Sequence, residues 1–153
     1  MKNVLFVCSG NTCRSPIAQG LLREKVANDA ELKGQVFVGS CGLGAFFGDP
    51  AQPNAIEAAA KLGADITAHR STRFGDVMFD SYDLILTMTK AQKDLMVTHA
   101  KEYADKIFSL SEYISDGADF TNVADPFGGD IDAYDKCAAQ LNDLVEKLVF
   151  KLK

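Results

Sequence analysis

The feature that most constrains this chain is an apolar run near its start that leads into a short loop. Residues 4–7 are aliphatic, β-branched or aromatic, without a polar break, which is typical of a strand buried on both faces of a parallel sheet. Cys8 follows directly, and Pro16 suits the first turn of a helix, where its missing N–H costs nothing. The sequence therefore predicts a strand, a loop over residues 9–14 and a helix.

The loop has the composition of an anion-binding site. Gly10 permits tight backbone conformations and Asn11 tolerates left-handed ones, so successive N–H groups can face one concavity at the positive end of the helix. Arg14 adds a planar guanidinium that can hold two oxygens of an oxyanion. We expect Cys8 to ionise in this positive field, because the field stabilises the thiolate. A thiolate that faces a bound oxyanion is a nucleophile for phosphorus.

A lone cysteine after an apolar strand is more often a buried core residue. The spacing C-x5-R, followed by Ser-Pro, favours the phosphate loop instead, because a core cysteine needs no arginine five residues later. The residues of this stretch that we expect to bind the substrate are Ser9, Gly10, Asn11, Thr12, Cys13 and Ser15.

Ser15 has two predicted tasks. It is placed to cap the first helix, because a serine side chain readily accepts from the free N–H groups of a helix start. Its hydroxyl can also donate to the sulfur of Cys8, which would help the thiolate to leave phosphorus in a second step.

Such a reaction also needs a general acid, because a leaving group departs far more easily once it is protonated. The candidate is Asp125, in a long loop over residues 115–130. Pro126 restricts the backbone before it, and Phe127 offers an apolar wall for the substrate. Asp-Pro also occurs in ordinary turns; together with the phosphate loop it indicates an acid that later activates water.

Strands and helices alternate along the rest of the chain. Apolar runs predict strands at residues 36–38, 84–88 and 106–109, and helical patterns or caps predict helices at residues 15–28, 55–62, 72–78, 90–98, 110–114 and 131–151. Asn54 is the expected cap of the second helix. The alternation predicts an α/β fold, with three α/β/α layers around a four-stranded parallel sheet. The phosphate loop then joins the first strand to the first helix, where such sheets bind ligands.

Length and charge exclude several classes of protein. The 153 residues fit a single domain over residues 1–153, and the net charge of −5 argues against nucleic acid as a partner. No apolar run approaches the roughly 18 residues of a membrane helix, and residues 4–7 are too few for a signal peptide. We expect a cytoplasmic protein without a membrane partner or a cofactor, as a monomer or weak homodimer.

The four cysteines, Cys8, Cys13, Cys41 and Cys137, form no C-x2-C pair, and the two histidines lie far apart in the sequence, so no metal site is expected. Cys137 falls on the apolar stripe of the last helix, which predicts a core cysteine. Cys8 and Cys13 flank one tight loop, so oxidation could join them transiently. Alternatively, Cys13 is only a small loop residue.

The segment V-C-S-G-N-T-C-R-S-P resembles the signature of the low-molecular-weight protein tyrosine phosphatases, and A-D-P-F-G at residues 124–128 resembles a second motif of that family. The resemblance extends over nearly the whole chain. It implies a cysteine-dependent protein phosphatase that acts on phosphorylated proteins through a phosphocysteine. It also implies that Asn11 and Ser40 hold the loop by hydrogen bonds, and that Cys13 takes part in redox protection.

Phe46 and Phe47 stand in a glycine-rich loop over residues 41–53. In the family this loop contributes to the wall of the active-site cleft, which would give one of these rings a role in substrate binding. Packing of one ring onto the core is an equally good interpretation.

Three positions depart from the tyrosine-phosphatase pattern. That branch usually has a bulky aliphatic residue where this chain has Thr12, two aromatic residues where it has Phe127 and Gly128, and an acidic residue where it has Thr89. In all three the chain resembles the bacterial protein-arginine phosphatase branch. A single aromatic wall also leaves less area for stacking a phenyl ring. Phosphoarginine is therefore slightly favoured over phosphotyrosine.

Arsenate reduction is a more remote alternative. Some proteins with this loop reduce arsenate through a relay of cysteines, which needs further cysteines around residues 80–95. The chain has none there.

Overall fold

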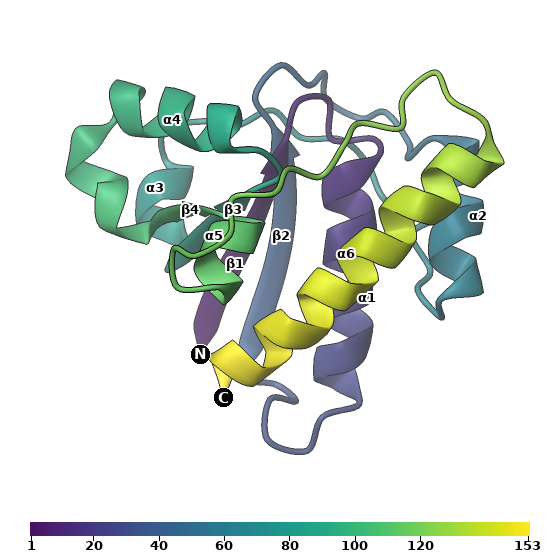
Figure 1. The fold of residues 1–153 in the computed structure, drawn as a ribbon, viewed down its shortest axis with the longest axis horizontal. Coiled ribbons are helices and arrows are strands. Elements are labelled where there is room, and N and C mark those ends of the chain that lie inside the picture. Colours follow the sequence, from purple (N-terminus) through teal and green to yellow (C-terminus); the bar gives the residue numbers. More distant parts are fainter.

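The computed structural model describes residues 1–153 as one parallel sheet between two layers of helices (Figure 1). The strand order is β2-β1-β3-β4. Strand β1 (Lys2–Cys8) lies between β2 (Val36–Gly42) and β3 (Leu84–Thr87), and β4 (Ile107–Ser109) pairs with β3. The predicted α/β fold class, with its loop between the first strand and the first helix, is confirmed.

The helices fall on both faces of the sheet, as its crossovers require. In Figure 1 one group lies to the right of the sheet and the other to the left. The right-hand group is α1 (Arg14–Ala27), α2 (Pro53–Lys61) and α6 (Ile131–Leu152), and the left-hand group is α3 (Met78–Ser81), α4 (Lys90–His99) and the 3-10 helix η1 (Lys101–Lys106). The short helix α5 (Leu110–Ile114) follows β4 and packs against α6.

The central strand β1 explains why the run at residues 4–7 has no polar break. Side chains alternate across a strand, and both faces of β1 are covered. Val4 and Phe6 join the larger core cluster, whereas Leu5 and Val7 join a smaller cluster on the opposite face. Cys8 continues the first set and stands at the carboxyl end of the strand.

Two of the predicted helix starts are wrong. Helix α1 begins at Arg14, with Cys13 as its N-cap, so Ser15 lies inside the helix and caps nothing. Helix α2 begins at Pro53, one residue before the predicted cap Asn54. Both helices start without a side-chain cap. In α1 the hydroxyl of Ser15 contacts Cys8 and Asn11 of the loop instead.

The helix predicted over residues 72–78 is also wrong. Gly42 and Thr72 share a backbone hydrogen bond of 2.9 Å, Phe74 donates to the Gly42 carbonyl, and Arg73 forms a β-bridge with Gly42. This pairing holds the segment extended and delays the helix to Met78–Ser81. Strand β2 itself runs to Gly42, beyond the predicted residues 36–38, because it pairs with β1 as far as Cys8.

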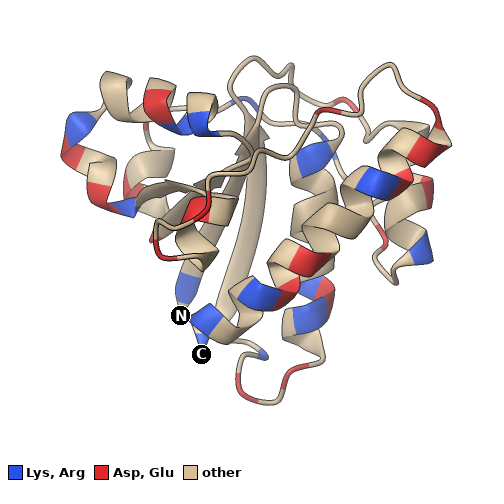
Figure 2. Cartoon of the chain, viewed as in Figure 1, with Lys and Arg blue, Asp and Glu red and all other residues tan.

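Charged residues lie mainly on the helices and loops, while the strands are almost free of them (Figure 2). None of the helices has both the length and the apolar composition needed to cross a lipid bilayer.

Candidate active site

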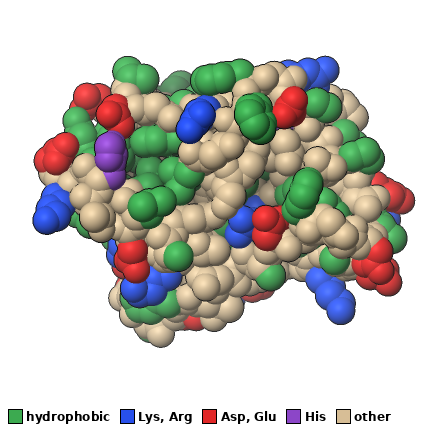
Figure 3. All heavy atoms as spheres, turned by 90° about the horizontal axis from the view of Figure 1, so that it is seen from above, with side chains coloured by type: hydrophobic (Ala, Val, Ile, Leu, Met, Phe, Trp, Pro, Cys, Tyr) green, Lys and Arg blue, Asp and Glu red, His purple; other side chains and the backbone are tan.

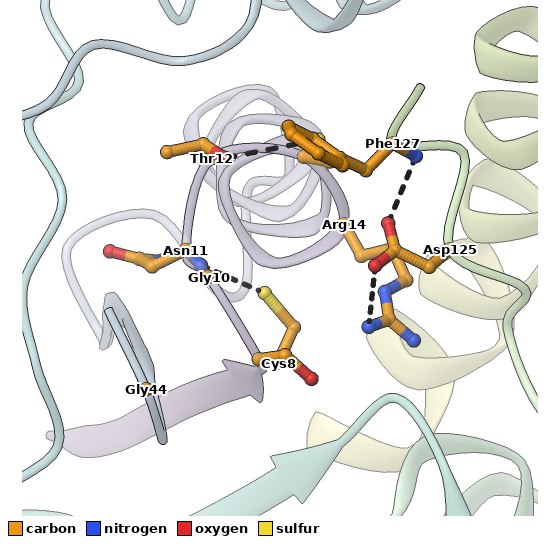
Figure 4. A pocket seen from close by; sticks show the side chains of 10 residues that line it. Cys8, Gly10, Asn11, Thr12, Arg14, Gly44, Asp125 and Phe127 are labelled. Carbon is orange, nitrogen blue, oxygen red and sulfur yellow. Dashed lines mark hydrogen bonds and ion pairs between the residues drawn. The ribbon is translucent and has the colours of Figure 1, made fainter. Parts of the chain in front are cut away.

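The loop after β1 wraps around a cavity of about 320 Å³ at the carboxyl end of the sheet (Figure 4). Its lining comes from three segments: the whole loop from Cys8 to Arg14, Gly44 after β2, and Asp125 with Phe127 before α6. Asn11 takes the left-handed conformation predicted for it, with φ of 57°. The structure thus brings together nearly all residues predicted for the site, from parts of the chain more than 100 residues apart.

The sulfur of Cys8 lies among hydrogen-bond donors. The backbone N–H of Asn11 donates to it over 3.3 Å, and the hydroxyl of Ser15 lies 2.9 Å away. The oxygen of Ser15 already accepts from the Asn11 amide at 2.7 Å, so its proton is available to an acceptor; the sulfur, at 2.9 Å, lies closer than the other acceptor, the Cys41 carbonyl at 3.5 Å. This arrangement suits a thiolate, which accepts both bonds.

The side chain of Asn11 fixes the loop to the rest of the molecule. It is fully buried, and its amide also donates to Ser40, over 3.0 Å. Its carbonyl oxygen accepts from the backbone N–H of Thr72, and its backbone carbonyl accepts from the ring of His69 at 2.7 Å. Asn11 and Ser40 therefore form the hydrogen-bonded support expected of them.

The loop also packs tightly against the end of β2. A Cβ atom added at Gly42 would lie 2.6 Å from the carbonyl oxygen of Ser9 and 2.9 Å from the N–H of Asn11. Side chains do not approach backbone atoms so closely, so only glycine fits here.

The guanidinium of Arg14 is buried at the rim of the cavity. It donates to the Val123 carbonyl over 3.0 Å and lies 3.6 Å from the carboxylate of Asp125, which is about half-exposed. The same carboxylate accepts from the N–H of Phe127, which fixes a tight turn around Pro126. In Figure 4, Asp125 and Arg14 lie beside Cys8, and Phe127 lies near Thr12.

The second cysteine of the loop has a different environment. The sulfur of Cys13 lies 3.4 Å from the hydroxyl of Tyr134 in α6, and burial raises the pKa of the Cys13 thiol. All four cysteines are free and buried. Cys137 belongs to the core, as predicted, and burial raises its pKa to about 12.

Neither interpretation of the loop phenylalanines is correct. Phe46 and Phe47 are 76% and 73% exposed, so neither packs on the core, and neither lines the cavity. Gly44 is the residue that this loop contributes to the cavity. Viewed from above, this end of the molecule shows scattered apolar side chains among charges of both signs (Figure 3).

Sequence reasoning missed Gln92. This buried residue of α4 donates to the hydroxyl of Ser9 over 3.1 Å, and its carbonyl oxygen accepts from the N–H groups of Met88 and Thr89. The available signal was the T-x-x-Q spacing of Thr89 and Gln92, which is typical of a capping box at a helix start. That signal predicts the helix start but not the contact with the loop.

No cluster of three or more His, Cys, Asp or Glu side chains is arranged to hold a metal ion. The chemistry of the site lies in a nucleophilic sulfur, a set of anion-binding donors and one carboxylic acid. These three parts suit transfer of a phosphoryl group to sulfur and then to water.

Comparison with known proteins points to the same chemistry. The chain is 36% identical over 152 residues to a protein-arginine-phosphatase of Bacillus subtilis, and the match covers 99% of this chain and 97% of that protein. It is 34% identical to the low molecular weight protein-tyrosine-phosphatase PtpB of Staphylococcus epidermidis, over 97% of each chain.

A solved structure of YwlE arginine phosphatase, a cysteine-to-serine mutant with a phosphorylated active-site serine, superposes with a TM-score of 0.87 at 35% identity. The match covers 98% of this chain and 95% of that one. The family described as low molecular weight phosphotyrosine protein phosphatase matches residues 3–153. As its signature segments predict, the chain belongs to this family.

Proposed function

We propose that this chain is a protein phosphatase in which Cys8 is the nucleophile, Arg14 clamps the phosphoryl group and Asp125 is the general acid. The observation that carries the proposal is the placement of the Cys8 sulfur in a cavity whose rim holds both Arg14 and Asp125. The phosphorylated active-site residue of the similar YwlE structure supports a phosphoenzyme intermediate.

The reaction takes two steps. The Cys8 thiolate attacks phosphorus, an S–P bond forms, and the bond to the leaving group breaks as Asp125 gives that group its proton. Asp125, now a carboxylate, then takes a proton from a water molecule that attacks phosphorus. The S–P bond breaks, inorganic phosphate leaves, and Ser15 donates to the departing thiolate.

The loop from Ser9 to Cys13 supplies the other substrate contacts of this proposal. Its N–H groups surround the developing charge on the phosphoryl oxygens, in the manner of an oxyanion hole. Phe127, which is 65% exposed at the cavity, offers its ring to the carrier of the phosphoryl group.

Phosphoarginine proteins are the favoured substrate. The hydroxyl of Thr12 has only one long contact, of 3.9 Å to the Cys13 sulfur, so it is available to orient a polar guanidine leaving group. Phe127 is the only aromatic side chain lining the cavity, which limits stacking on a phenyl ring. The similarity to a protein-arginine-phosphatase supports this preference.

Phosphotyrosine proteins are the alternative substrate, because the chain is nearly as similar to the tyrosine phosphatase PtpB. A paired assay separates the two. Reduced protein is given a phosphoarginine protein and a phosphotyrosine peptide, with Cys8→Ser as control. Faster release of phosphate from phosphoarginine supports phosphoarginine proteins as the substrate. Faster release from phosphotyrosine supports phosphotyrosine proteins instead and leaves the mechanism unchanged. Activity that survives in Cys8→Ser would overturn the mechanism.

The role of Thr12 has its own test. Thr12→Ile should lower the ratio of phosphoarginine to phosphotyrosine activity, because it replaces a hydroxyl with an apolar side chain. An unchanged ratio would show that Thr12 does not set the preference.

Three further expectations stay proposals. The protein acts in the cytoplasm, as a monomer or weak homodimer, and peroxide joins Cys8 to Cys13 reversibly, protecting Cys8 from over-oxidation. Mass spectrometry after mild peroxide treatment tests the last of these. Cys8 found only over-oxidised, and never bridged to Cys13, would contradict it.

A further inference from the structure

Gln92 stands outside the cavity but is bonded to the phosphate loop at Ser9 and to the backbone of Met88 and Thr89 after β3. Its side chain is only 8% exposed, and every polar atom of its amide group faces a partner. The carbonyl oxygen accepts from the backbone N–H groups of Met88 and Thr89, at 3.0 and 3.1 Å. These two bonds fix which end of the amide points toward the phosphate loop.

The carbonyl oxygen of Gln92 is linked to Arg14 by a chain of hydrogen bonds. It accepts from the N–H of Met88, and the carbonyl of Met88 accepts from the N–H of Val123 at 2.9 Å. The carbonyl of Val123 in turn accepts from the guanidinium of Arg14 at 3.0 Å. Asp125 lies two residues beyond Val123 and 3.6 Å from the same guanidinium. The position of Met88 thus bears on both the clamp and the acid.

The amide nitrogen of Gln92 is bonded directly to Ser9. The amide nitrogen donates to the Ser9 hydroxyl oxygen over 3.1 Å. A hydroxyl that accepts one hydrogen bond keeps its own proton for another partner. Because Ser9 lines the cavity, that proton is available to the bound phosphorylated substrate.

We propose that Gln92 is a positioning residue for the phosphatase reaction, which orients the Ser9 hydroxyl directly and sets Arg14 and Asp125 through Met88 and Val123. This inference rests on the proposed function. It differs from a purely structural role, in which Gln92 only completes the capping box of α4 with Thr89.

Gln92→Glu separates these roles. Glutamate serves a capping box as well as glutamine does, and it keeps an oxygen for Met88 and Thr89. As a carboxylate it cannot donate to Ser9, whose proton would turn toward the new carboxylate. We expect a slightly lower melting temperature, because the new charge is buried, and an unchanged kcat, with KM for a small aryl phosphate raised about three- to tenfold, the range of one lost hydrogen bond.

The added charge of this variant needs a control, because a carboxylate could repel phosphate without any hydrogen bond. The same substitution is therefore made in a Ser9→Ala background, where it should change KM less than twofold. A full-sized effect there would show charge repulsion alone and overturn the role assigned to Ser9. Wild-type KM in Gln92→Glu would overturn it as well.

Gln92→Leu tests the path to Arg14, because it removes the oxygen as well. We expect kcat to fall about tenfold and the inhibition constant of inorganic phosphate to rise by a similar factor. The matched control is Ser109→Ala, which breaks the equivalent capping box of α5, away from the cavity. If kcat and the inhibition constant of phosphate change no more in Gln92→Leu than in Ser109→Ala, Gln92 does not position Arg14 through Met88 and Val123.

All variants are compared with the unmodified protein in one assay. If the unmodified protein hydrolyses the aryl phosphate and the variants behave like it, only the role of Gln92 is overturned. If the unmodified protein hydrolyses neither this ester nor a phosphoarginine protein, the proposed function fails, and this inference fails with it.

Discussion

The side chains that contact the sulfur of Cys8 have little freedom, because Asn11 and Ser15 are also hydrogen-bonded to each other. Asn11 donates to Ser15, and this leaves the Ser15 proton for the sulfur. The order of donors matters as much as the distances, since reversing one bond would leave the sulfur without its hydroxyl donor.

Ser15→Ala removes that donor while leaving the Asn11 N–H contact to sulfur in place. We expect kcat to fall at least tenfold, because the second step expels a thiolate that has lost a hydrogen bond to a charged group, about 1.5–3 kcal/mol. Phosphocysteine should accumulate during turnover, which intact-mass spectrometry of rapidly quenched enzyme detects. Normal kcat without accumulation would contradict the role, and Ser81→Ala, an exposed serine in α3, is the control.

The four cysteines should differ in reactivity. Burial raises the pKa of Cys13, Cys41 and Cys137, so only a small fraction of these thiols is ionised near neutral pH and their alkylation is slow. Iodoacetamide at pH 7 should therefore label Cys8 first, and inorganic phosphate should slow that labelling. Peptide mass spectrometry measures it. Labelling of Cys13 as fast as that of Cys8 would contradict this expectation.

At the scale of elements, the backbone of β2 and the phosphate loop share one closely packed contact. Gly42→Ala places a methyl group against the backbone of Ser9 and Asn11, where nothing flexible can yield. We expect the free energy of unfolding to drop by about 1–3 kcal/mol, the range for overpacking, together with a loss of phosphatase activity. Chemical denaturation measures the first.

The matched control is Gly75→Ala, because a methyl group there meets no atom within 4 Å. It should leave activity and stability nearly unchanged. Equal free energies of unfolding for Gly42→Ala and Gly75→Ala would show that the phosphate loop accommodates the methyl group without loss of stability.

Elements with strong local signals were predictable, and those set by distant partners were not. The apolar run at residues 4–7 and the C-x5-R spacing predicted β1, the loop and α1, because both depend on neighbouring residues. The segment at residues 72–78 was predicted as a helix, but pairing with Gly42 and Asn11, 30 or more residues away, holds it extended. Gln92 was missed for the same reason, since its contact with Ser9 spans 83 residues.

At the scale of the whole molecule, folding and formation of the site depend on the same bonds. The loop is held by Ser40 of β2, by His69 and Thr72 of the segment between α2 and α3, and by Gln92 of α4. No one element fixes the loop alone. A change that weakens these anchors should therefore lower stability and catalysis together.

His69 makes this coupling dependent on pH. Burial lowers its pKa below the usual 6.5, and its neutral ring donates to the Asn11 carbonyl. Below about pH 6.5 the unfolded chain therefore binds a proton that the folded protein resists, so stability should rise as the pH is raised toward the pKa of the unfolded histidine, about 6.5, and level off above it. His69→Gln keeps a donor without titrating and should flatten this slope in pH-dependent denaturation, whereas His99→Gln, at an exposed histidine, should retain it. If stability depends on pH in His69→Gln as it does in the unmodified protein, protonation of His69 is not coupled to folding.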